Sequence, residues 1–454
     1  MTKLVPITPC VSLADLFALV CDEPHAAFLD SALHDEQGRY SLVGLHPSLV
    51  LEDREGQLMA NGLPSDGSFL ERLRREFEER REPNETSLPI VAGCLGYLSY
   101  DFGRALERVE TSHPRTSQMP EALMCFYELL LIEDHECGEL YAAVHTDDPE
   151  RAQTLIDEAH ELASRSTPLA LPSRFAGDLR FEANFSQADY LRALESLIEH
   201  MAAGDSYVAN LTQTFTETVD ARVHSYDIYR YLRTYNPAPF AAYINVGCAQ
   251  VLCASMERFV QLRGREVTTR PIKGTRPRGA TPEQDRLFRA ELEASEKDKS
   301  ELLMVVDLER NDLSKVCEPG TVKVPVLFET EGYATVFHLV ATVTGTLSAG
   351  KNAVDLIEAT FPGGSITGAP KRRTMQIIDE LEHGRRGLYT GSIGYLSLDG
   401  DADLNIVIRT AVREGCRCTV GAGGGITYES DVDFEYEETR TKARAVLEAI
   451  ASVE

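Results

Sequence analysis

Apolar and polar positions follow two patterns along this chain, and each pattern predicts a different kind of element. In the N-terminal part, short apolar runs with glycine breaks, such as residues 91–100, predict strands. Residues 123–131 and 140–145 have the pattern of two strands paired in a hairpin. Residues 152–164 instead repeat apolar side chains every three to four positions, which predicts a helix.

Residues 166–173 interrupt both patterns with prolines and hydroxyl side chains, a composition typical of a linker. We therefore expect an N-terminal domain over residues 1–165, a linker over residues 166–185 and a second domain over residues 186–454. Ser186 is expected to cap the first helix of the second domain.

Strands are longer and more frequent in the second domain. We expect them at residues 206–218, 240–246, 249–255, 321–325, 335–347, 391–398, 406–412 and 417–422. Helices are expected at residues 186–203, 224–236, 282–304, 353–360, 370–381 and 431–452. Several strands follow one another with no helix between them, which favours antiparallel pairing. The pattern predicts an α+β fold of layered, antiparallel-rich β-sheets with outer helices.

Composition narrows the classes of partner. The chain has 454 residues and a formal net charge of -27, from 45 basic and 72 acidic residues. Such an excess of negative charge repels phosphate groups, so we expect neither nucleic acid nor a membrane surface as a partner. No apolar run approaches the ~18 residues of a membrane span. The cysteines lack paired C-x-x-C spacing and no signal peptide is apparent, so we expect reduced thiols and a cytoplasmic location.

Lys273 is the first candidate for chemistry. It lies between a proline turn and Gly274, in a segment, residues 269–278, that carries three arginines. Neighbouring cations and partial burial favour the neutral form of a lysine, and a neutral amine is a nucleophile. Taken alone, the segment fits a solvated basic loop better than a reactive lysine, so the case for chemistry depends on the rest of the chain.

Two glycine-rich segments are candidates for holding an anion. Residues 361–371 form a glycine and hydroxyl loop that opens a helix at Pro370, where backbone N–H groups are available. No Gly-Lys-Ser/Thr sequence follows, which excludes a Walker loop. Residues 421–426 follow a strand, and their missing side chains let a ligand approach the backbone. Either segment could also be a plain turn.

Carboxylates on the last expected helix are candidates for a metal site. Glu435, Glu438 and Lys442 share one helical face. Such a face is commonly only solvated, but it would form a hard oxygen site for Mg²⁺ if Glu301 of another helix converged on it.

Three further ionisable residues have both a structural and a chemical interpretation. His338 lies in an apolar strand and is either a satisfied core histidine or a catalyst. Arg409, also expected in a strand, needs a partner if it is buried, and a substrate carboxylate would supply one. Glu257 ends a strand and is an acid, a base or an ion-pair partner.

Taken together, these segments resemble the chorismate-utilising enzymes. That family includes the component I chains of anthranilate synthase and aminodeoxychorismate synthase, isochorismate synthase and salicylate synthase. The resemblance is dense over residues 186–447 and looser over the first 150. Its motifs lie at residues 204–207, 210–213, 236–240, 271–275, 307–312, 362–371, 391–395 and 436–439. The resemblance implies an anthranilate synthase component I-like fold, with residues 186–454 as the chorismate-binding catalytic domain.

Residue 273 separates the activities within the family. Residues 271–275 are similar to the Pro-Ile-Lys-Gly-Thr of aminodeoxychorismate synthases, whereas anthranilate synthases carry alanine in place of the lysine. The resemblance implies that Lys273 attacks ring C2 of chorismate while Glu257 protonates the departing C4 hydroxyl. Ammonia then enters at C4 and gives 4-amino-4-deoxychorismate, for p-aminobenzoate and folate biosynthesis. Anthranilate synthase component I and a non-catalytic chorismate-binding homologue remain as alternatives.

The resemblance implies further site residues. His338 would be catalytic, and the metal would be Mg²⁺, held by Glu301, Glu438 and Glu435. Substrate contacts would come from Thr275, Thr367, Tyr395, Arg409, Gly424, Gly425 and Lys442. A candidate tryptophan site would comprise Ser31, Tyr40, Pro239 and Phe240, although the usual Leu-Glu-Ser element is Leu-Asp-Ser here.

The source of ammonia is implied to lie outside this chain. No Gly-x-Cys-x-Gly nucleophile turn with a following His-x-Glu is present, and residues 93–96 are the nearest approach to one. The resemblance therefore implies a separate glutamine amidotransferase subunit that pairs with this chain as a heterodimer.

Overall fold

The computed structural model describes residues 2–34, 37–332 and 336–453. Its strands are β1 (Thr2–Pro6), β2 (Ala27–Asp30), β3 (Tyr40–Arg54), β4 (Gln57–Ala60), β5 (Leu63–Pro64), β6 (Gly93–Leu98), β7 (Ala122–Asp134), β8 (Glu139–His145), β9 (Glu182–Ala183), β10 (Val208–Thr218), β11 (Phe240–Asn245), β12 (Gln250–Ser255), β13 (Arg258–Arg263), β14 (Glu266–Thr269), β15 (Ile272–Pro277), β16 (Lys323–Gly332), β17 (Val336–Thr346), β18 (Gly368–Ala369), β19 (Ser392–Ser397), β20 (Ala402–Asn405), β21 (Thr410–Glu414) and β22 (Arg417–Ile426). Its helices are α1 (Leu13–Phe17), α2 (Phe69–Glu79), α3 (Tyr100–Leu106), α4 (Pro149–Arg165), α5 (Gln187–Ala202), α6 (Ser225–Tyr235), α7 (Pro282–Ala294), α8 (Glu296–Ser314), α9 (Ala353–Thr360), α10 (Lys371–Leu381) and α11 (Val432–Ala451).

Two antiparallel sheets share the long strands β3 and β7. The first half of β7 pairs with β6 and its second half pairs with β8. Strand β3 likewise pairs with β2 near its start and with β4 near its end, and its register with β7 shifts between Pro47 and Leu49. Such a bulge bends a strand, so β3 can pass from one sheet into the other. One sheet continues through β2, β11, β12, β21, β22 and β10. The other continues through β6, β19, β20, β13, β14 and β17.

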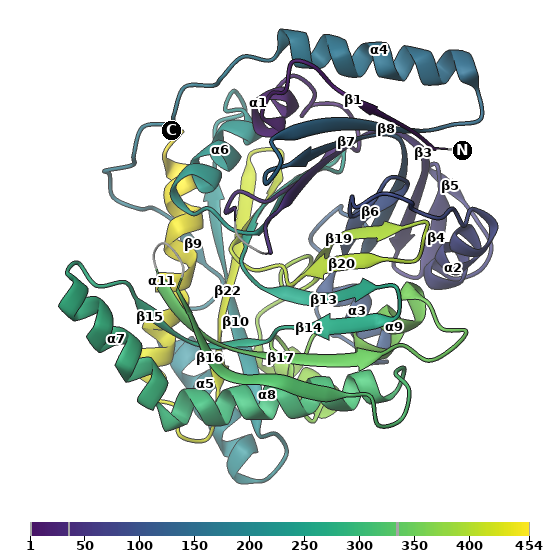
Figure 1. Ribbon diagram of the computed structural model, residues 1–454. Coiled ribbons are helices and arrows are strands. Elements are labelled where there is room, and N and C mark those ends of the chain that lie inside the picture. Colours follow the sequence, from purple (N-terminus) through teal and green to yellow (C-terminus); the bar gives the residue numbers. More distant parts are fainter. Residues whose placement is uncertain (1, 35–36, 333–335, 454) are drawn as a thin grey trace.

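Apolar side chains fill the space between the sheets and cover their outer faces. The inner core contains Tyr97, Leu130, Ile244 and Ile393, contributed by strands of both sheets. Alternate residues of the same strands, such as Tyr243, face outward against helices, because side chains alternate between the faces of a strand. Helices α1, α4, α6 and α11 pack on one outer face, and α2, α3, α8, α9 and α10 on the other. Figure 1 shows α4 lying along β8 and α8 lying along β17.

The predicted fold class is confirmed: the molecule is an α+β protein with antiparallel, layered sheets and outer helices.

One predicted helix is divided into two in the structure. Residues 282–304 fall in α7 and α8, because Ser295 has an extended backbone and its side chain accepts a hydrogen bond from the N–H of Asp298 as the N-cap of α8. Helix α8 then continues to Ser314. The predicted strand at 406–412 begins only at Thr410, and the predicted start at Thr335 lies outside the described residues.

The division at residues 166–185 stays a prediction, and hydrogen-bonded ladders cross it. Strand β2 pairs with β11, and β6 pairs with β19. The segment before β9 runs along the surface without helix or strand. Two tyrosines of α6 anchor this segment. The hydroxyl of Tyr231 accepts from the N–H of Phe175 at 3.1 Å, and that of Tyr235 donates to the carbonyl of Pro172 at 2.8 Å.

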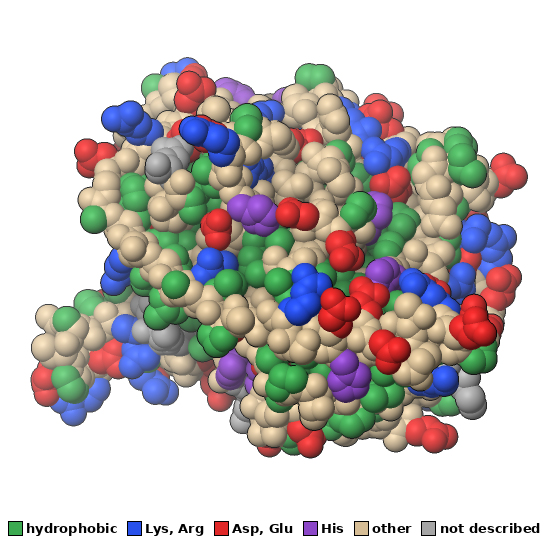
Figure 2. Space-filling model, turned by 90° about the horizontal axis from the view of Figure 1, so that it is seen from above, with side chains coloured by type: hydrophobic (Ala, Val, Ile, Leu, Met, Phe, Trp, Pro, Cys, Tyr) green, Lys and Arg blue, Asp and Glu red, His purple; other side chains and the backbone are tan. Residues whose placement is uncertain are grey.

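The helices of the described residues do not combine the length and apolar character needed to cross a membrane. On the face shown in Figure 2, acidic and basic side chains are interspersed.

Candidate active site

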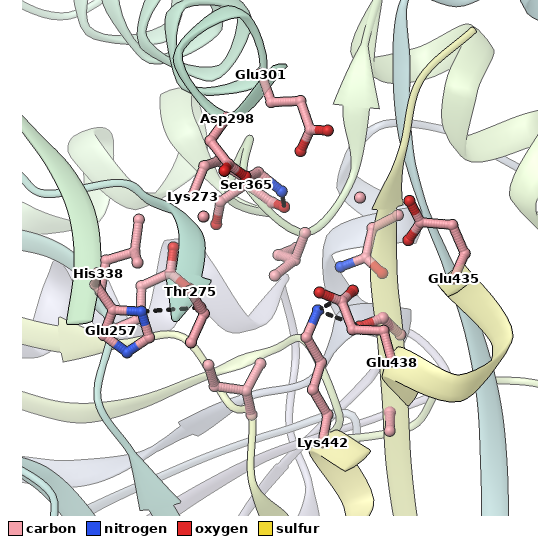
Figure 3. A pocket seen from close by; sticks show the side chains of 18 of the residues that line it. Glu257, Lys273, Thr275, Asp298, Glu301, His338, Ser365, Glu435, Glu438 and Lys442 are labelled. Atoms are coloured by element: carbon pink, nitrogen blue, oxygen red, sulfur yellow. Dashed lines mark hydrogen bonds and ion pairs between the residues drawn. The ribbon is translucent and has the colours of Figure 1, made fainter. Parts of the chain in front are cut away.

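A cavity of about 580 Å³ collects most of the residues singled out in the sequence. Its walls come from β15, β17, β22, α8 and α11, together with the loop before β18. Figure 3 shows Lys273 and Glu301 on one side of the cavity, Glu435, Glu438 and Lys442 on another, and His338 with Thr275 and Glu257 on a third. The elements come from residues far apart in the sequence, so the fold rather than local structure creates the site.

Glycines of β22 let the backbone pass between charged groups. A Cβ atom at Gly424 would lie 2.9 Å from Oε2 of Glu438 and 3.0 Å from Oε2 of Glu435. A Cβ atom at Gly425 would lie 2.8 Å from Nζ of Lys273. These separations are shorter than ordinary contacts, so the two positions need glycine for their neighbours to stay where they are.

Lys273 is surrounded by carboxylates rather than by cations. It extends from β15, its Nζ donates a hydrogen bond to the carbonyl of Ser365 at 3.2 Å, and its charge acts on the carboxyl groups of Glu257 and Glu301. The neighbouring arginines are engaged elsewhere: Arg270 pairs with Glu331, Arg276 with Glu291 and Asp298, and Arg278 with Asp285. The local electrostatics therefore differ from the basic surroundings expected from the sequence.

Three glutamates from two helices face the cavity and are compensated by lysines. Glu301 lies on α8, and Glu435 and Glu438 lie on α11. Nζ of Lys297 lies 3.2 Å from Glu435 Oε1 and 3.8 Å from Glu301 Oε1. Nζ of Lys442 lies 2.8 Å from Glu438 Oε2. Burial raises the pKa of Glu301 to about 7 and raises that of Glu435. Burial also opposes ionisation of Glu438, but the charge and hydrogen bond of Lys442, together with the charges of Lys273 and Lys297, outweigh it and the pKa is lowered.

The glutamates fit Mg²⁺ by donor type. An all-carboxylate set is what a hard divalent cation prefers, and a magnesium ion commonly completes its shell with water and substrate oxygens. The three residues do not form a group whose ligand atoms all lie within 4.8 Å of one another. Within the described ranges, the group that meets this criterion is Cys21, Asp22 and His224, away from the cavity. A bound ion would draw the glutamates closer together.

His338, Thr275 and Glu257 form the wall opposite α11. Nδ1 of His338 is hydrogen-bonded to Oγ1 of Thr275 at 3.0 Å. Burial lowers the pKa of His338 to about 4, with Arg409 adding to the effect, so the imidazole is neutral near neutral pH. Burial raises the pKa of Glu257, against the opposing hydrogen bond from Ser365 and the charge of Lys273. A carboxyl group with a raised pKa can act as a proton donor.

Arg409 lines the cavity but does not belong to a strand. Its backbone φ is 53°, a left-handed conformation that is uncommon outside glycine. Its Nη1 donates to the carbonyl of Lys442, so the Arg409 side chain is held against α11. The sequence pattern predicted a strand here because the flanking residues are apolar, and the turn at residue 409 interrupts it.

Three predicted substrate contacts are not among the residues that line the cavity. Gly424 lies in β22 between Gly423 and Gly425, which do line it. Thr367 is fully buried and its hydroxyl donates to the carbonyl of Gly363 at 2.8 Å. Tyr395 faces a second cavity, where its hydroxyl accepts from Nη2 of Arg263 at 2.8 Å. The alternation of β19 puts Tyr395 on the same side as core residue Ile393, away from the first cavity.

Several lining residues were not predicted. Tyr389, Asn210, Ser365 and Lys297 all border the cavity. The first three lie in or beside motifs noted in the sequence, which is a signal that could have found them. Lys297 lies one helical turn before Glu301, so helical spacing could have found it as well.

The second cavity, of about 190 Å³, gathers the four residues of the candidate tryptophan site. Ser31, Tyr40, Pro239 and Phe240 all line it. The Ser31 hydroxyl is already engaged, because it donates to the carbonyl of Tyr40 at 2.6 Å. Whether tryptophan is the occupant stays a prediction.

The fold and the site together define the class of protein. Residues 26–448 match the family of chorismate binding enzymes, and the chain belongs to this family of chorismate-utilising enzymes. It is 37% identical over 444 residues to aminodeoxychorismate synthase component 1 of Klebsiella aerogenes, covering 96% of each chain. It is 35% identical over 452 residues to anthranilate synthase component 1 of Thermus thermophilus, covering 99% of this chain and 96% of that one.

A solved structure agrees with these relatives. The crystal structure of anthranilate synthase component I from Streptococcus pneumoniae superposes with a TM-score of 0.82 at 29% identity, over 98% of this chain and 99% of that chain. The resemblance stated from the motifs is confirmed at the level of family and fold. Relatives of two activities have nearly equal identity, so identity alone does not separate them.

Proposed function

We propose that this chain aminates chorismate at C4 to give 4-amino-4-deoxychorismate, through a covalent adduct of Lys273. One observation carries the proposal: a lysine amine, the carboxylic acid of Glu257 and three further glutamates line the same cavity. An anthranilate-forming site in this family is similar in its remaining residues but has alanine at this position. The amine of Lys273 is therefore the group that directs nitrogen to a different ring carbon.

The cavity offers complementary groups for a dicarboxylate substrate. Glu301, Glu435 and Glu438 would hold Mg²⁺, which when bound supplies a Lewis-acidic contact for the ring carboxylate. Arg409 and Lys442 lie on the side of the cavity where the enolpyruvyl carboxylate would be held. The backbone of β22 at Gly424 and Gly425 would approach the substrate closely, together with the hydroxyl of Thr275.

The reaction then takes two displacements, and each one shifts both double bonds of the ring diene. In the first, the Lys273 amine forms a bond to ring C2, the two double bonds move from C1=C2 and C5=C6 to C1=C6 and C4=C5, and the C4–O bond breaks. Glu257 gives its proton to the departing hydroxyl, which leaves as water. In the second, ammonia forms a bond to C4, both double bonds return to C1=C2 and C5=C6, and the C2–N bond to Lys273 breaks. The proton that ammonia loses returns to the released lysine or to Glu257, and the enolpyruvyl group is retained.

The number of displacements decides where nitrogen enters. One direct attack of ammonia at C2 would lead to the ortho amine, as in anthranilate formation. Two attacks place nitrogen at C4. His338 is part of the scaffold that both reactions share, and its proposed catalytic role in this chain is to position Thr275 and to act as a neutral hydrogen-bonding group at the ring.

The proposed nitrogen source is a separate glutamine amidotransferase subunit that forms a heterodimer with this chain in the cytoplasm. Free ammonia at high pH would replace it in the test tube. The product would enter p-aminobenzoate and folate biosynthesis after a downstream lyase removes pyruvate.

The test is the position of the amino group. We would incubate the chain with chorismate, Mg²⁺ and ammonium, add the downstream lyase, and identify the aromatic amine by chromatography. We expect p-aminobenzoate. Anthranilate formed without the lyase would instead establish the first alternative, and chorismate binding without turnover would establish the non-catalytic one.

Lys273→Ala tests the covalent step. We expect formation of the para amine to fall by at least about 100-fold, because the first displacement loses its nucleophile. Without ammonia, intact mass spectrometry of the wild-type chain should show an added mass of chorismate less one water, and the variant should not. Lys299→Ala serves as the control, because this half-buried lysine of α8 pairs with Glu296 and does not line the cavity. Full para activity in Lys273→Ala would refute the adduct.

A further inference from the structure

Lys297 lies at the centre of the carboxylate cluster and has no step in the proposed reaction. It is one helical turn before Glu301 on α8, and its Nζ contacts Glu435 on α11 at 3.2 Å and Glu301 at 3.8 Å. The other two lysines of the cavity are engaged differently. Nζ of Lys273 donates to a backbone carbonyl, and Nζ of Lys442 bonds to Glu438 on its own helix and to the carbonyl of Gly423.

We propose that Lys297 is a resident counter-ion that occupies the place of the metal ion and must withdraw when Mg²⁺ binds, so that it sets the metal affinity of the site. The inference rests on the proposed metal site. Glu301 and Glu435 are almost completely buried, with 9% and 3% of their side chains exposed. Buried carboxylates without a cation are strongly destabilising, so the metal-free chain needs a positive charge between the two helices.

An ammonium group and Mg²⁺ compete for the same oxygen atoms. The ammonium of Lys297 lies between a carboxylate of α8 and one of α11, where it holds the two groups apart at the distances of an ion pair. A magnesium ion requires ligand oxygens at ~2.1 Å, so the same carboxylates have to close around it. The two cations cannot occupy this space together, because like charges at such distances repel.

The side chain has a place to which it can withdraw. Lys297 is 37% exposed, whereas the glutamates that it contacts are buried. Its Nζ lies 5.9 Å from the ring centre of Phe434, a residue that is itself 61% exposed. A lysine with a partly exposed, flexible side chain can swing toward water along such an aromatic face without unfolding the helix that carries it.

The test is the affinity for Mg²⁺ alone, measured by isothermal titration calorimetry with MgCl₂ and no chorismate. Lys297→Met keeps the length of the stem and removes the charge. We expect the dissociation constant for Mg²⁺ to fall by about tenfold, the size of effect typical of groups that support metal ligands. We also expect a lower thermal midpoint of unfolding without Mg²⁺ and recovery when Mg²⁺ is added, because the buried carboxylates lose their counter-ion.

Two variants separate this effect from a general change in charge. Lys299→Met removes a lysine of the same helix that pairs with Glu296 at 3.1 Å, and it should leave the Mg²⁺ affinity unchanged. Lys297→Arg keeps the positive charge and should bind Mg²⁺ no more tightly than the wild type.

The outcomes distinguish the two proposals. Tighter Mg²⁺ binding by Lys297→Met, including binding seen only in this variant, supports the counter-ion role. Unchanged or weaker binding by Lys297→Met, beside measurable binding by the wild type, overturns the role of Lys297 and leaves the metal site standing. Binding by neither chain overturns both.

Discussion

At the scale of single residues, the cavity is organised by opposite charges held at short range. Lysine side chains lie beside the glutamates that line the cavity. Each of these carboxylates has a cation or a hydrogen-bond donor next to it. At Glu257, the hydroxyl of Ser365 and the charge of Lys273 favour the ionised form, while burial favours the protonated form and prevails.

The raised pKa of Glu257 predicts how activity falls at high pH, which is the alkaline limb of the pH–activity profile. In the proposed reaction Glu257 must be protonated to release the C4 hydroxyl, so activity should fall as pH rises through its pKa. The raised pKa extends the active range upward. Ser365→Ala removes a donor that stabilises the carboxylate, so the pKa rises further and the alkaline limb should move to higher pH. Measurement of kcat against pH checks this. Ser365→Thr, which keeps a hydroxyl, should retain the wild-type limb, and a shift of Ser365→Ala to lower pH would remove Glu257 from the role of acid.

At the scale of elements, α8 connects the cavity to a second polar cluster in the core. Its first turns carry Glu301, and two turns later it carries Glu309, whose Oε2 accepts from the hydroxyl of Thr269 at 2.8 Å. Asp312 follows, paired with Nζ of Lys371 at 2.6 Å, and Lys371 begins the helix after the glycine loop. Helix α8 therefore fixes both the carboxylate of Glu301 in the cavity and, through Lys371, the end of the glycine loop.

Glu309 makes the stability of the molecule depend on pH. Burial raises its pKa to about 8, so between about pH 4.5 and 8 the folded chain holds a proton that the unfolded chain has released. Its contribution to stability is therefore complete below that window and is lost as pH rises through it, by up to about 1.4 kcal/mol per pH unit. Glu309→Gln cannot ionise. Urea unfolding at pH 5.5 and 8.5 should show a smaller loss of unfolding free energy for this variant than for the wild type. Equal losses would mean that Glu309 titrates normally.

The long periodic elements could be predicted from the sequence, because local pattern determines them. Helix α9 matches its predicted range, and α11 and β10 match to within two residues. The turn at Arg409 and the place of Tyr395 could not be predicted, because both depend on which strands become neighbours. The pairing of Lys297 with Glu435 joins residues from different helices, and this proximity exists only after folding.

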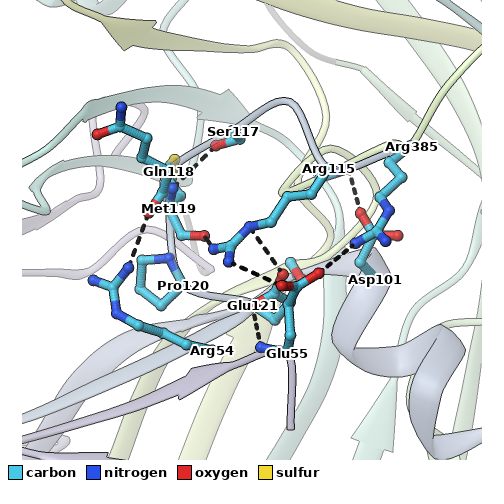
Figure 4. A network of polar contacts seen from close by, with 12 residues as sticks. Arg54, Glu55, Asp101, Arg115, Ser117, Gln118, Met119, Pro120, Glu121 and Arg385 are labelled. Carbon is cyan, nitrogen blue, oxygen red and sulfur yellow. Dashed lines mark hydrogen bonds and ion pairs between the residues drawn. The ribbon is translucent and has the colours of Figure 1, made fainter. Parts of the chain in front are cut away.

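At the scale of the whole molecule, contacts between the first 165 residues and the rest are of two kinds. Figure 4 shows a polar network in which Arg115, from the first 165 residues, and Arg385, from the rest of the chain, both approach Glu55, at 3.8 and 3.7 Å. Arg385 also donates to the carbonyl of His113 at 2.9 Å. Ion pairs near the surface contribute little to stability. The ladder between β6 and β19 and the apolar core between the sheets contribute more, because they remove large apolar areas from water.

These shared ladders predict that the chain unfolds as one cooperative unit rather than as two domains. Gly96→Ala tests this, because a Cβ at Gly96 would lie 1.9 Å from the carbonyl oxygen of Leu123, where β6 passes between β7 and β19. We expect a destabilisation of about 1–3 kcal/mol, typical of overpacking. In scanning calorimetry the whole transition should move to lower temperature, with the calorimetric and van't Hoff enthalpies in agreement. If residues 186–454 formed an independent domain, part of the heat absorption would stay at the wild-type temperature. Such an independent domain is not expected, because the inner-core side chains of β11, β12 and β19 are buried against those of β3, β6 and β7. Without the first 165 residues these apolar side chains would be exposed to water.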